Sequence, residues 1–166
     1  MEIERQFIVP RDAVLPPLEG AESTLLAQGY VSFQPEIRLR VINGQSFLLT
    51  IKSGAGLSRG EAELFISAAE YEALLPRLQP GSFLIEKRRY HLPLDGGLTA
   101  ELDVHLGRLS GLCYVEVEFP DEAAARAFTP PAWFGRELTE MREFSSSLLA
   151  TTPDFATLQK LFPSLL

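Results

Sequence analysis

The sequence predicts one α+β domain over residues 1–166, with antiparallel strands in one sheet and helices packed against it. Apolar and charged residues alternate with a period of two in several segments, which is typical of strands whose two faces differ. Asn43-Gly44 and Asp95-Gly96-Gly97 lie between such segments and favour hairpin turns, because these residues tolerate positive φ. The chain has 166 residues, of which 46% are hydrophobic and 22% charged, so it is long enough to bury one core.

Each element follows from its local pattern. The alternation predicts strands near residues 2–9, 30–42, 46–53, 59–66, 83–92, 98–105 and 113–119. Helices are expected at about 21–28, 67–78, 121–128, 140–149 and 154–161. Ser67 is suited to cap the second of these helices, and Pro120 precedes the third. Gly54-Ala55-Gly56 is interpreted as a turn, because the Lys-Ser/Thr pair of a phosphate-binding loop does not follow it.

The composition excludes several classes of function. Lys and Arg number 15 and Asp and Glu 22, which gives a formal net charge of −7 and a pI near 4.9. This balance argues against a general nucleic-acid or anionic-membrane surface, so an anionic ligand must be held locally. The single cysteine, Cys113, excludes an internal disulfide and a cysteine-based zinc site, and it fits a cytoplasmic location. We expect no signal peptide and no membrane span, because residues 2–5 are largely charged and no run of about 20 apolar residues occurs.

Charged side chains of like sign recur two residues apart, on one face of most predicted strands. Glu2 and Glu4 share a face, as do Arg38 and Arg40. The later strands add Lys52; Arg59 with Glu61 and Glu63; Lys87 with Arg89; Glu101 with Asp103; and Glu116 with Glu118. One interpretation is ordinary half-buried strands whose charged faces meet water. The other is a sheet of about eight strands closed into a barrel with a charged lumen, which the like-charge pairs and the separation of acids and bases onto different strands favour.

A lumen of this kind needs counter-ions, because buried charges without partners are costly. Mg²⁺ or Mn²⁺ suits carboxylate oxygens and also binds phosphate oxygens, and with two histidines in the chain a metal would have to be held by oxygen. Arg and Lys side chains bind the non-bridging oxygens of phosphates. The pattern therefore predicts a chain of phosphates, together with metal, as the ligand.

Several motifs resemble those of the CYTH superfamily, also called triphosphate tunnel metalloenzymes, and they occur in the family's order over roughly residues 2–150. They are Glu2-Ile3-Glu4-Arg5-Gln6, Gln28-Gly29-Tyr30, Ile37-Arg38-Leu39-Arg40, Thr50-Ile51-Lys52-Ser53-Gly54, Arg59-Gly60-Glu61-Ala62-Glu63, Lys87-Arg88-Arg89-Tyr90, Glu101-Leu102-Asp103-Val104, Val115-Glu116-Val117-Glu118-Phe119 and Trp133-Phe134-Gly135-Arg136-Glu137-Leu138-Thr139. Each motif alone is a weak signal. Their shared order makes the resemblance specific.

The resemblance implies an eight-stranded antiparallel tunnel that hydrolyses or cyclises triphosphates with divalent metal. By motif, the residues that would bind the phosphate chain are Tyr30, Arg38, Arg40, Lys52, Arg59, Lys87 and Arg89. The residues that would hold the metal, two Mg²⁺ or Mn²⁺ ions, are Glu2, Glu4, Glu61, Glu63, Asp103, Glu116 and Glu118. Lys52 and Glu4 are the expected catalytic residues. One ion would orient the phosphate chain, and the other would lower the pKa of the attacking water.

One position departs from the family's pattern. The lysine of the first motif is Gln6 here, and Arg5 is expected to point to the opposite face of its strand. Losing a charge-assisted hydrogen bond costs about 1.5–3 kcal/mol of phosphate binding. The change fits a weaker enzyme, a different binding register, a shorter ligand, or a binding module with little turnover.

The favoured function is metal-dependent hydrolysis of inorganic tripolyphosphate or another small triphosphate. The alternatives among enzymes are thiamine triphosphatase, nucleoside triphosphatase and class IV adenylyl cyclase. The alternative from another class is a non-catalytic module that binds polyphosphate or a nucleotide. A small phosphate chain is the expected partner and a homodimer is compatible with the sequence, whereas neither nucleic acid nor a membrane is expected.

Few other residues carry chemistry. Tyr30 is expected either to hydrogen-bond a tunnel lysine or to be a simple strand-end aromatic. His91 and His105 are interpreted as polar strand residues, and Cys113 as a small hydrophobic one. The run of serines at 145–147 has no companion histidine and base, so it does not predict a nucleophile.

Overall fold

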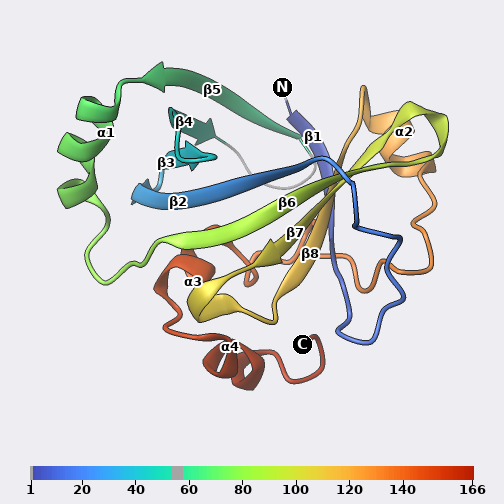
Figure 1. Ribbon diagram of the computed structural model, residues 1–166. Coiled ribbons are helices and arrows are strands. Elements are labelled where there is room, and N and C mark those ends of the chain that lie inside the picture. The colour runs from blue at the N-terminus through green and yellow to red at the C-terminus, as the bar shows by residue number, and fades with distance from the viewer. Residues whose placement is uncertain (1, 54–57) are drawn as a thin grey trace.

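The protein's structure, a computed structural model, describes residues 2–53 and 58–166, with the backbone alone for Ser53, Ser58 and Arg59 (Figure 1). Within these residues, eight strands form one antiparallel sheet in the order β1-β5-β4-β3-β2-β6-β7-β8. The strands are β1 (Glu2–Ile8), β2 (Ser23–Phe33), β3 (Glu36–Ile42), β4 (Ser46–Ser53), β5 (Ser58–Ile66), β6 (Ile85–Pro93), β7 (Thr99–His105) and β8 (Cys113–Glu118). The expected α+β class and the eight-stranded antiparallel sheet are confirmed. The turn expected at Gly54-Ala55-Gly56 lies outside the described residues.

The sheet curls into a near-barrel because β1 meets both of its edges. The start of β1 pairs with β5 through Glu2–Arg59 and Ile3–Ser58. The rest of β1 pairs with β8 over five residue pairs. In the described chain, β1 and β5 are therefore joined by two residue pairs only. The remainder of β5 has no strand paired to it on that side. The predicted barrel is present, and it opens along β5.

Four short helices in the described residues cover the ends of the barrel. They are α1 (Ala68–Leu74), α2 (Glu122–Ala127), α3 (Ser146–Thr151) and α4 (Phe155–Leu161). Figure 1 shows α1 at the crossover from β5 to β6, α2 at the opposite end, and α3 and α4 below the sheet. The predicted cap at Ser67 is confirmed, because its side chain accepts from the Glu70 N–H and the Glu70 carboxylate accepts from Ser67 in return. No helix in the described part of the chain is long and apolar enough to cross a membrane.

The helix predicted at 21–28 is wrong, because Ser23–Phe33 forms β2. β2 lies inside the sheet and pairs with β3 on one side and β6 on the other, as Leu26 does with Ile42 and Lys87. Ladders on both sides satisfy the backbone of the strand and override a weak local preference for helix.

Two further boundaries differ from the prediction. The strand expected at 30–42 is two strands, β2 and β3, which a turn at Gln34-Pro35 separates. Pro35 has no N–H to donate to a ladder, so it suits that turn. The helix expected at 140–149 begins only at Ser146, and the side chain of Ser145 accepts the N–H of Leu148 at its start. A serine of the 145–147 run is therefore a helix cap.

The barrel interior is half apolar and half charged. On the inward face, Ile8, Tyr30, Ile85 and Tyr114 form a buried cluster with residues of α3 and α4, among them Leu158. This cluster fills one end of the lumen. A second cluster, which includes Phe7, Leu102, Val117 and Phe134, covers the outer face of β1, β7 and β8. The charged residues occupy the part of the lumen that the first cluster leaves unfilled.

Arg5 points away from the lumen, as predicted, and ties β1 to the C-terminal segment. Its guanidinium donates to both oxygens of the Glu137 carboxylate at 2.8 and 2.7 Å. It also donates to the carbonyls of Ala125 and Phe128 at 2.9 and 3.0 Å. Glu137, from the last of the family-like motifs (residues 133–139), therefore has a structural role. Its carboxylate binds the outer face of β1, while Glu4 and Gln6 face inward.

Replacing Arg5 with alanine is expected to lower the free energy of unfolding by about 2–3 kcal/mol, because four hydrogen bonds to two carbonyls and one carboxylate are lost. Arg126 is the matched control, since its exposed pair with Glu122 should be worth less than about 0.5 kcal/mol. Urea denaturation of both variants measures the difference. Equal losses would show that Arg5 holds nothing in place.

Candidate functional site

The charged strand faces meet in one enclosed cavity of about 100 Å³. Cross-strand register aligns them: Arg38 lies opposite Thr50, Lys52 opposite Glu61, and Arg89 opposite Asp103. The cavity is lined by Glu2, Glu4, Gln28, Glu36, Arg38, Arg40, Lys52, Glu61, Arg89, Glu101, Tyr114, Glu116, Glu118 and Ser146. The interpretation of the charged faces as a lumen holds, and that of a solvent-facing wall does not.

Lys52 is the centre of one ionic cluster. Its ammonium lies 2.8 Å from a carboxylate oxygen of Glu2 and 2.8 Å from one of Glu61. Burial and the neighbouring Arg38 would lower the pKa of Lys52, but the hydrogen bonds to these two carboxylates raise it above its ordinary value. Lys52 is therefore a fixed cation at neutral pH.

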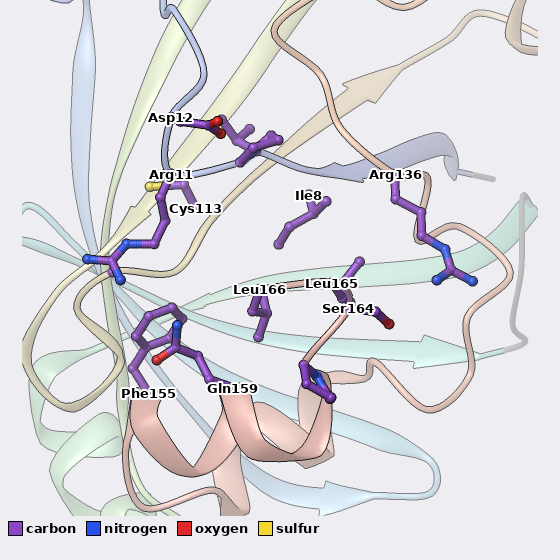
Figure 2. Close-up of a pocket in the computed structure, with 14 residues that line it drawn as sticks. Ile8, Arg11, Asp12, Cys113, Arg136, Phe155, Gln159, Ser164, Leu165 and Leu166 are labelled. Carbon is purple, nitrogen blue, oxygen red and sulfur yellow. The ribbon is translucent and has the colours of Figure 1, made fainter.

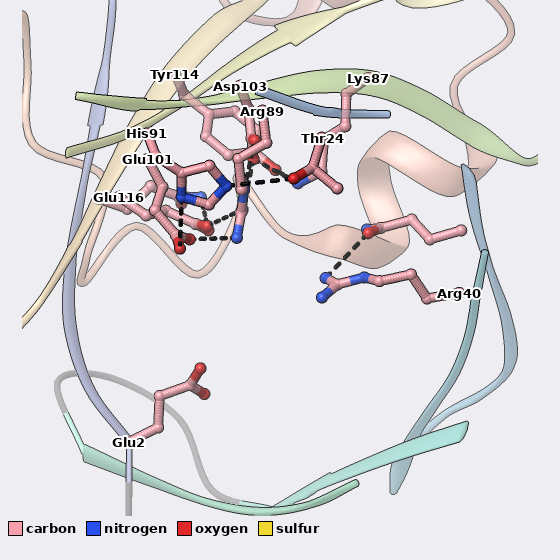
Figure 3. A network of polar contacts seen from close by, with 12 residues as sticks. Glu2, Thr24, Arg40, Lys87, Arg89, His91, Glu101, Asp103, Tyr114 and Glu116 are labelled. Atoms are coloured by element: carbon pink, nitrogen blue, oxygen red, sulfur yellow. Dashed lines mark hydrogen bonds and ion pairs between the residues drawn. The ribbon is translucent and has the colours of Figure 1, made fainter. Parts of the chain in front are cut away.

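Arg89 is the centre of a second cluster (Figure 3). Its Nε and Nη2 donate to the two oxygens of Asp103, each at 2.7 Å, and its other contacts are short hydrogen bonds to Glu101 and Glu116. Although burial disfavours the charge, Asp103 and Glu116 raise the pKa of Arg89 well above its ordinary value. Three carboxylates of β7 and β8 thus fix the position of the planar Arg89 guanidinium.

Lys87 lies behind this cluster rather than in the cavity. It is 2% exposed, and its ammonium donates to Asp103 and, at 3.2 Å, to the Tyr114 hydroxyl. Burial lowers the pKa of Lys87 to about 8, against the attraction of Asp103. Burial would raise the pKa of Asp103, but Lys87 and Arg89 together hold it well below its usual range. Asp103 is fully buried between the two cations, so it orders them.

Arg38 and Arg40 face the cavity with little compensation. Arg40 donates to the Gln28 side chain at 3.2 Å, and Arg38 donates to Thr50 at 3.4 Å. The Nε atoms of both arginines are buried and have no hydrogen-bond partner among the described residues. Burial, then the charges of Arg38 and Arg89, lower the pKa of Arg40 to about 10. Two cations whose Nε donors are buried and unused form a site for an anion.

The described part of the lumen is negative. Among the described side chains on its inner face, five cations stand against nine carboxylates, which leaves a net charge of −4 when all are ionised. The donors are carboxylate oxygens, which suit a hard divalent cation, and such cations would also balance the excess charge. Within residues 2–53 and 58–166, no three acidic, histidine or cysteine side chains already converge on one point. The chemistry of the donor set fits a metal, and Lys52 and Arg89 now occupy the carboxylates that would bind it.

The structure brings most of the predicted site residues to the cavity. Those that line it are Glu2, Glu4, Arg38, Arg40, Lys52, Glu61, Arg89, Glu116 and Glu118. Tyr30, Glu63, Lys87 and Asp103 lie beside or beneath it, and the side chain of Arg59 is outside the description. The Tyr30 hydroxyl accepts from Gln28 at 3.0 Å, whereas the tyrosine that contacts a lysine is Tyr114.

Gln6 replaces a cation with a neutral donor. Its side-chain amide donates to one oxygen of Glu116 at 3.0 Å, while the other oxygen accepts from Arg89. The amide keeps Glu116 in place and adds no charge. The departure seen in the sequence therefore makes this wall of the lumen more negative than a lysine would.

Sequence reasoning missed several cavity residues. Glu36 shares a face with Arg38, so a longer count of the period-two pattern would have found it. Gln28 was part of a motif that resembles the family's, but it was given no role, and the helix expected at 21–28 did not place it on the inward face of a strand. Ser146 enters from α3, and Glu101 was seen on the same face as Asp103 without being given a role. No strand pattern signals a residue such as Ser146, because tertiary packing alone brings it to the lumen.

Comparison with known proteins agrees with this geometry. A family model described as the CYTH domain matches residues 1–152. An inorganic triphosphatase of Nitrosomonas europaea is 43% identical over 152 residues, which cover 90% of this chain and 96% of the relative. An inorganic triphosphatase of Acetivibrio thermocellus is 37% identical over 154 residues, covering 92% and 94%. The crystal structure of the inorganic triphosphatase NE1496 superposes with a TM-score of 0.66 at 39% identity, covering 93% of this chain and 97% of that one.

Changing Asp103 to asparagine is expected to lower the free energy of unfolding by about 3 kcal/mol or more, because Lys87 stays buried without its carboxylate. Changing Lys87 to methionine should cost clearly less, since Asp103 keeps its two bonds to Arg89. Because the folded-state pKa of Asp103 is depressed, its stabilisation is present at neutral pH and is lost as the pH falls through that pKa. Urea denaturation at neutral pH tests the order, and equal losses would contradict it.

Proposed function

The chain belongs to the CYTH domain family, and from this premise we propose that it is a divalent-metal-dependent inorganic triphosphatase that works inside the lumen. One observation carries the proposal: Arg38 and Arg40 face a cavity of carboxylates with unused, buried donors. The two curated relatives support it, because each is an inorganic triphosphatase and aligns over nine-tenths of this chain. Tripolyphosphate supplies the anionic oxygens that these arginines need.

The chain's own cations hold the phosphates. Arg38 and Arg40, two residues apart on the inward face of β3, bind non-bridging oxygens in the lumen. Lys52 on β4 and Arg89 on β6 bind further phosphate oxygens. Their carboxylate partners fix the positions of the ammonium and the guanidinium. Lys87 and Asp103 position Arg89 and do not touch the substrate.

The carboxylates that line the cavity are the residues we assign to metal. They are Glu2, Glu4, Glu61, Glu116 and Glu118, and the charge excess of the lumen suits two Mg²⁺ or Mn²⁺ ions. When bound, the metal neutralises phosphate charge and lowers the pKa of water. Glu63 is less suited as a ligand, since it accepts from Thr50 and lies 3.9 Å from Arg38.

Hydrolysis requires water to attack the terminal phosphorus while the bridging P–O bond breaks. Lys52 keeps its proton, so it stabilises the charge that develops on the phosphate oxygens and does not act as the base. Glu4 lies on the neighbouring wall of the cavity, and we assign it to orient the attacking water and accept its proton. The products are phosphate and pyrophosphate.

A non-catalytic module that binds polyphosphate is the second candidate, and Gln6 is the observation that favours it. A neutral amide in place of a lysine weakens the binding of a phosphate at the wall that β1 forms. The retained carboxylates favour turnover instead. Product analysis separates the two, and it also separates hydrolysis from cyclisation.

The direct test incubates the protein with Mg²⁺ or Mn²⁺ and, in turn, tripolyphosphate, thiamine triphosphate and ATP. We expect equal amounts of phosphate and pyrophosphate from tripolyphosphate, and no cyclic AMP from ATP. Arg38→Glu should lower kcat/KM by about 100-fold or more while the circular dichroism spectrum stays native, because charge reversal expels the anion. Binding without turnover would select the module, and an active Arg38→Glu variant would remove the proposed site.

Gln6→Lys is expected to lower KM for tripolyphosphate by about tenfold, because a charge-assisted bond to phosphate is restored on the wall of β1. Gln6→Met is the matched control, as it keeps the volume and gives no donor. Initial rates over a range of tripolyphosphate concentrations measure the effect. A higher KM in Gln6→Lys would mean that this chain binds its substrate in another register.

A further inference from the structure

A second cavity lies at the opposite end of the barrel from the charged lumen. Its volume is about 460 Å³, which is within the range of small-molecule sites. One wall is the end of β1 at Ile8 and the start of β8 at Cys113. The other wall is the C-terminal segment, from Phe155 to Leu166. We call this space the rim cavity (Figure 2).

Six of the fourteen residues that line the rim cavity lie outside the family match. The CYTH model ends at residue 152, whereas α4 and the segment after it supply the whole of the second wall. The cavity therefore combines residues of the family match with residues of the C-terminal segment. The C-terminal segment thus forms one wall of this cavity.

Close packing holds both walls in place. A Cβ atom at Gly111, which has a φ of +109°, would lie 2.7 Å from the ring of Phe155, so α4 approaches the β7–β8 loop as closely as glycine allows. At Gly135, a Cβ atom would lie 2.8 Å from the carbonyl oxygen of Ile8. These contacts fix Phe155 and the end of β1, and Leu165 and Leu166 pack against the first core cluster.

The lining combines apolar residues with three charged ones, Arg11, Arg136 and Asp12. Ile8, Leu165 and Leu166 lie inside it, and Arg136 and Ser164 lie on one side (Figure 2). Arg11 lies on the other side, where its guanidinium is 5.8 Å from the centre of the Phe155 ring. In the described chain, neither arginine takes part in an ion pair. Two cations against the one carboxylate of Asp12 leave the charged lining positive on a protein with a net charge of −7, so it favours an anion.

We propose that the rim cavity binds a small amphiphilic carboxylate, with its apolar body against Ile8 and Leu166 and its carboxylate on the guanidinium of Arg136. Free phosphate has no apolar body to cover Ile8 and Leu166, so an amphiphilic anion fits this lining better. The unpaired guanidinium rejects a cation of the same shape. Arg136 carries the head group because Arg11 is already stacked on Phe155.

The test uses octanoate, octylamine and octanol as probes of one size and three head groups, without metal or triphosphate. Calorimetric titration measures affinity, and alkylation of Cys113, the single cysteine, by N-ethylmaleimide reports the location. We expect octanoate to bind at one site, to slow alkylation, and to bind about tenfold more tightly than octylamine. Octanol should fall between them.

Arg136→Gln should weaken octanoate binding by about tenfold and leave octanol binding unchanged, because only the charge-assisted bond is lost. Arg126→Gln is the control, since Arg126 lies on α2 away from the rim cavity. The proposal is overturned if octylamine protects Cys113 as well as octanoate, if Arg136→Gln binds octanoate normally, or if octanoate shows no saturable binding. None of these outcomes depends on triphosphatase activity.

Discussion

Charge balance inside the lumen is the constraint on which the rest of the structure depends. Five cations and nine carboxylates of the described chain face one enclosed space, and an unpaired charge there is costly. The ion pairs of Lys52 and Arg89 neutralise some of these carboxylates within the protein. Arg38 and Arg40 and the surplus of carboxylates remain, and both need ligands of opposite sign. A triphosphate chain with divalent metal satisfies both at once, which is why we propose that substrate and cofactor bind together.

The fold keeps this charged space small and rigid. One end of the lumen is filled by the apolar cluster of Tyr30, Tyr114 and the helices α3 and α4, so the charges are confined to the remainder. From outside, Arg5 and Glu137 hold β1, which carries Glu4 and Gln6 on its inner face. Buried groups that do not touch the cavity, above all Asp103, direct those that do. The narrow β1–β5 seam is the part of the wall with the fewest strand contacts.

The sequence predicted which charged residues share the inner face of the sheet better than it predicted where the elements begin and end. Period-two spacing is enough to place Arg38 and Arg40 on one face, because the strand pleat alone decides which way a side chain points. The same spacing cannot show that Lys87 and Asp103 lie beneath the surface of the cavity, since their depth depends on the partners across the sheet. Residues 21–28 read locally as a helix and form a strand only because β3 and β6 pair with them from both sides. Ser146 could not be foreseen, as it reaches the lumen through the packing of α3.

The central claim is that the lumen takes up a triphosphate together with divalent cations, because alone each would leave it unbalanced. Calorimetric titration of the protein with tripolyphosphate at low temperature, in EDTA and again with Ca²⁺ or Mg²⁺, tests this most directly. The account predicts binding at least about 100-fold tighter with the divalent cation, since the net charge of −4 repels the free polyanion. Equal affinity in EDTA would contradict it.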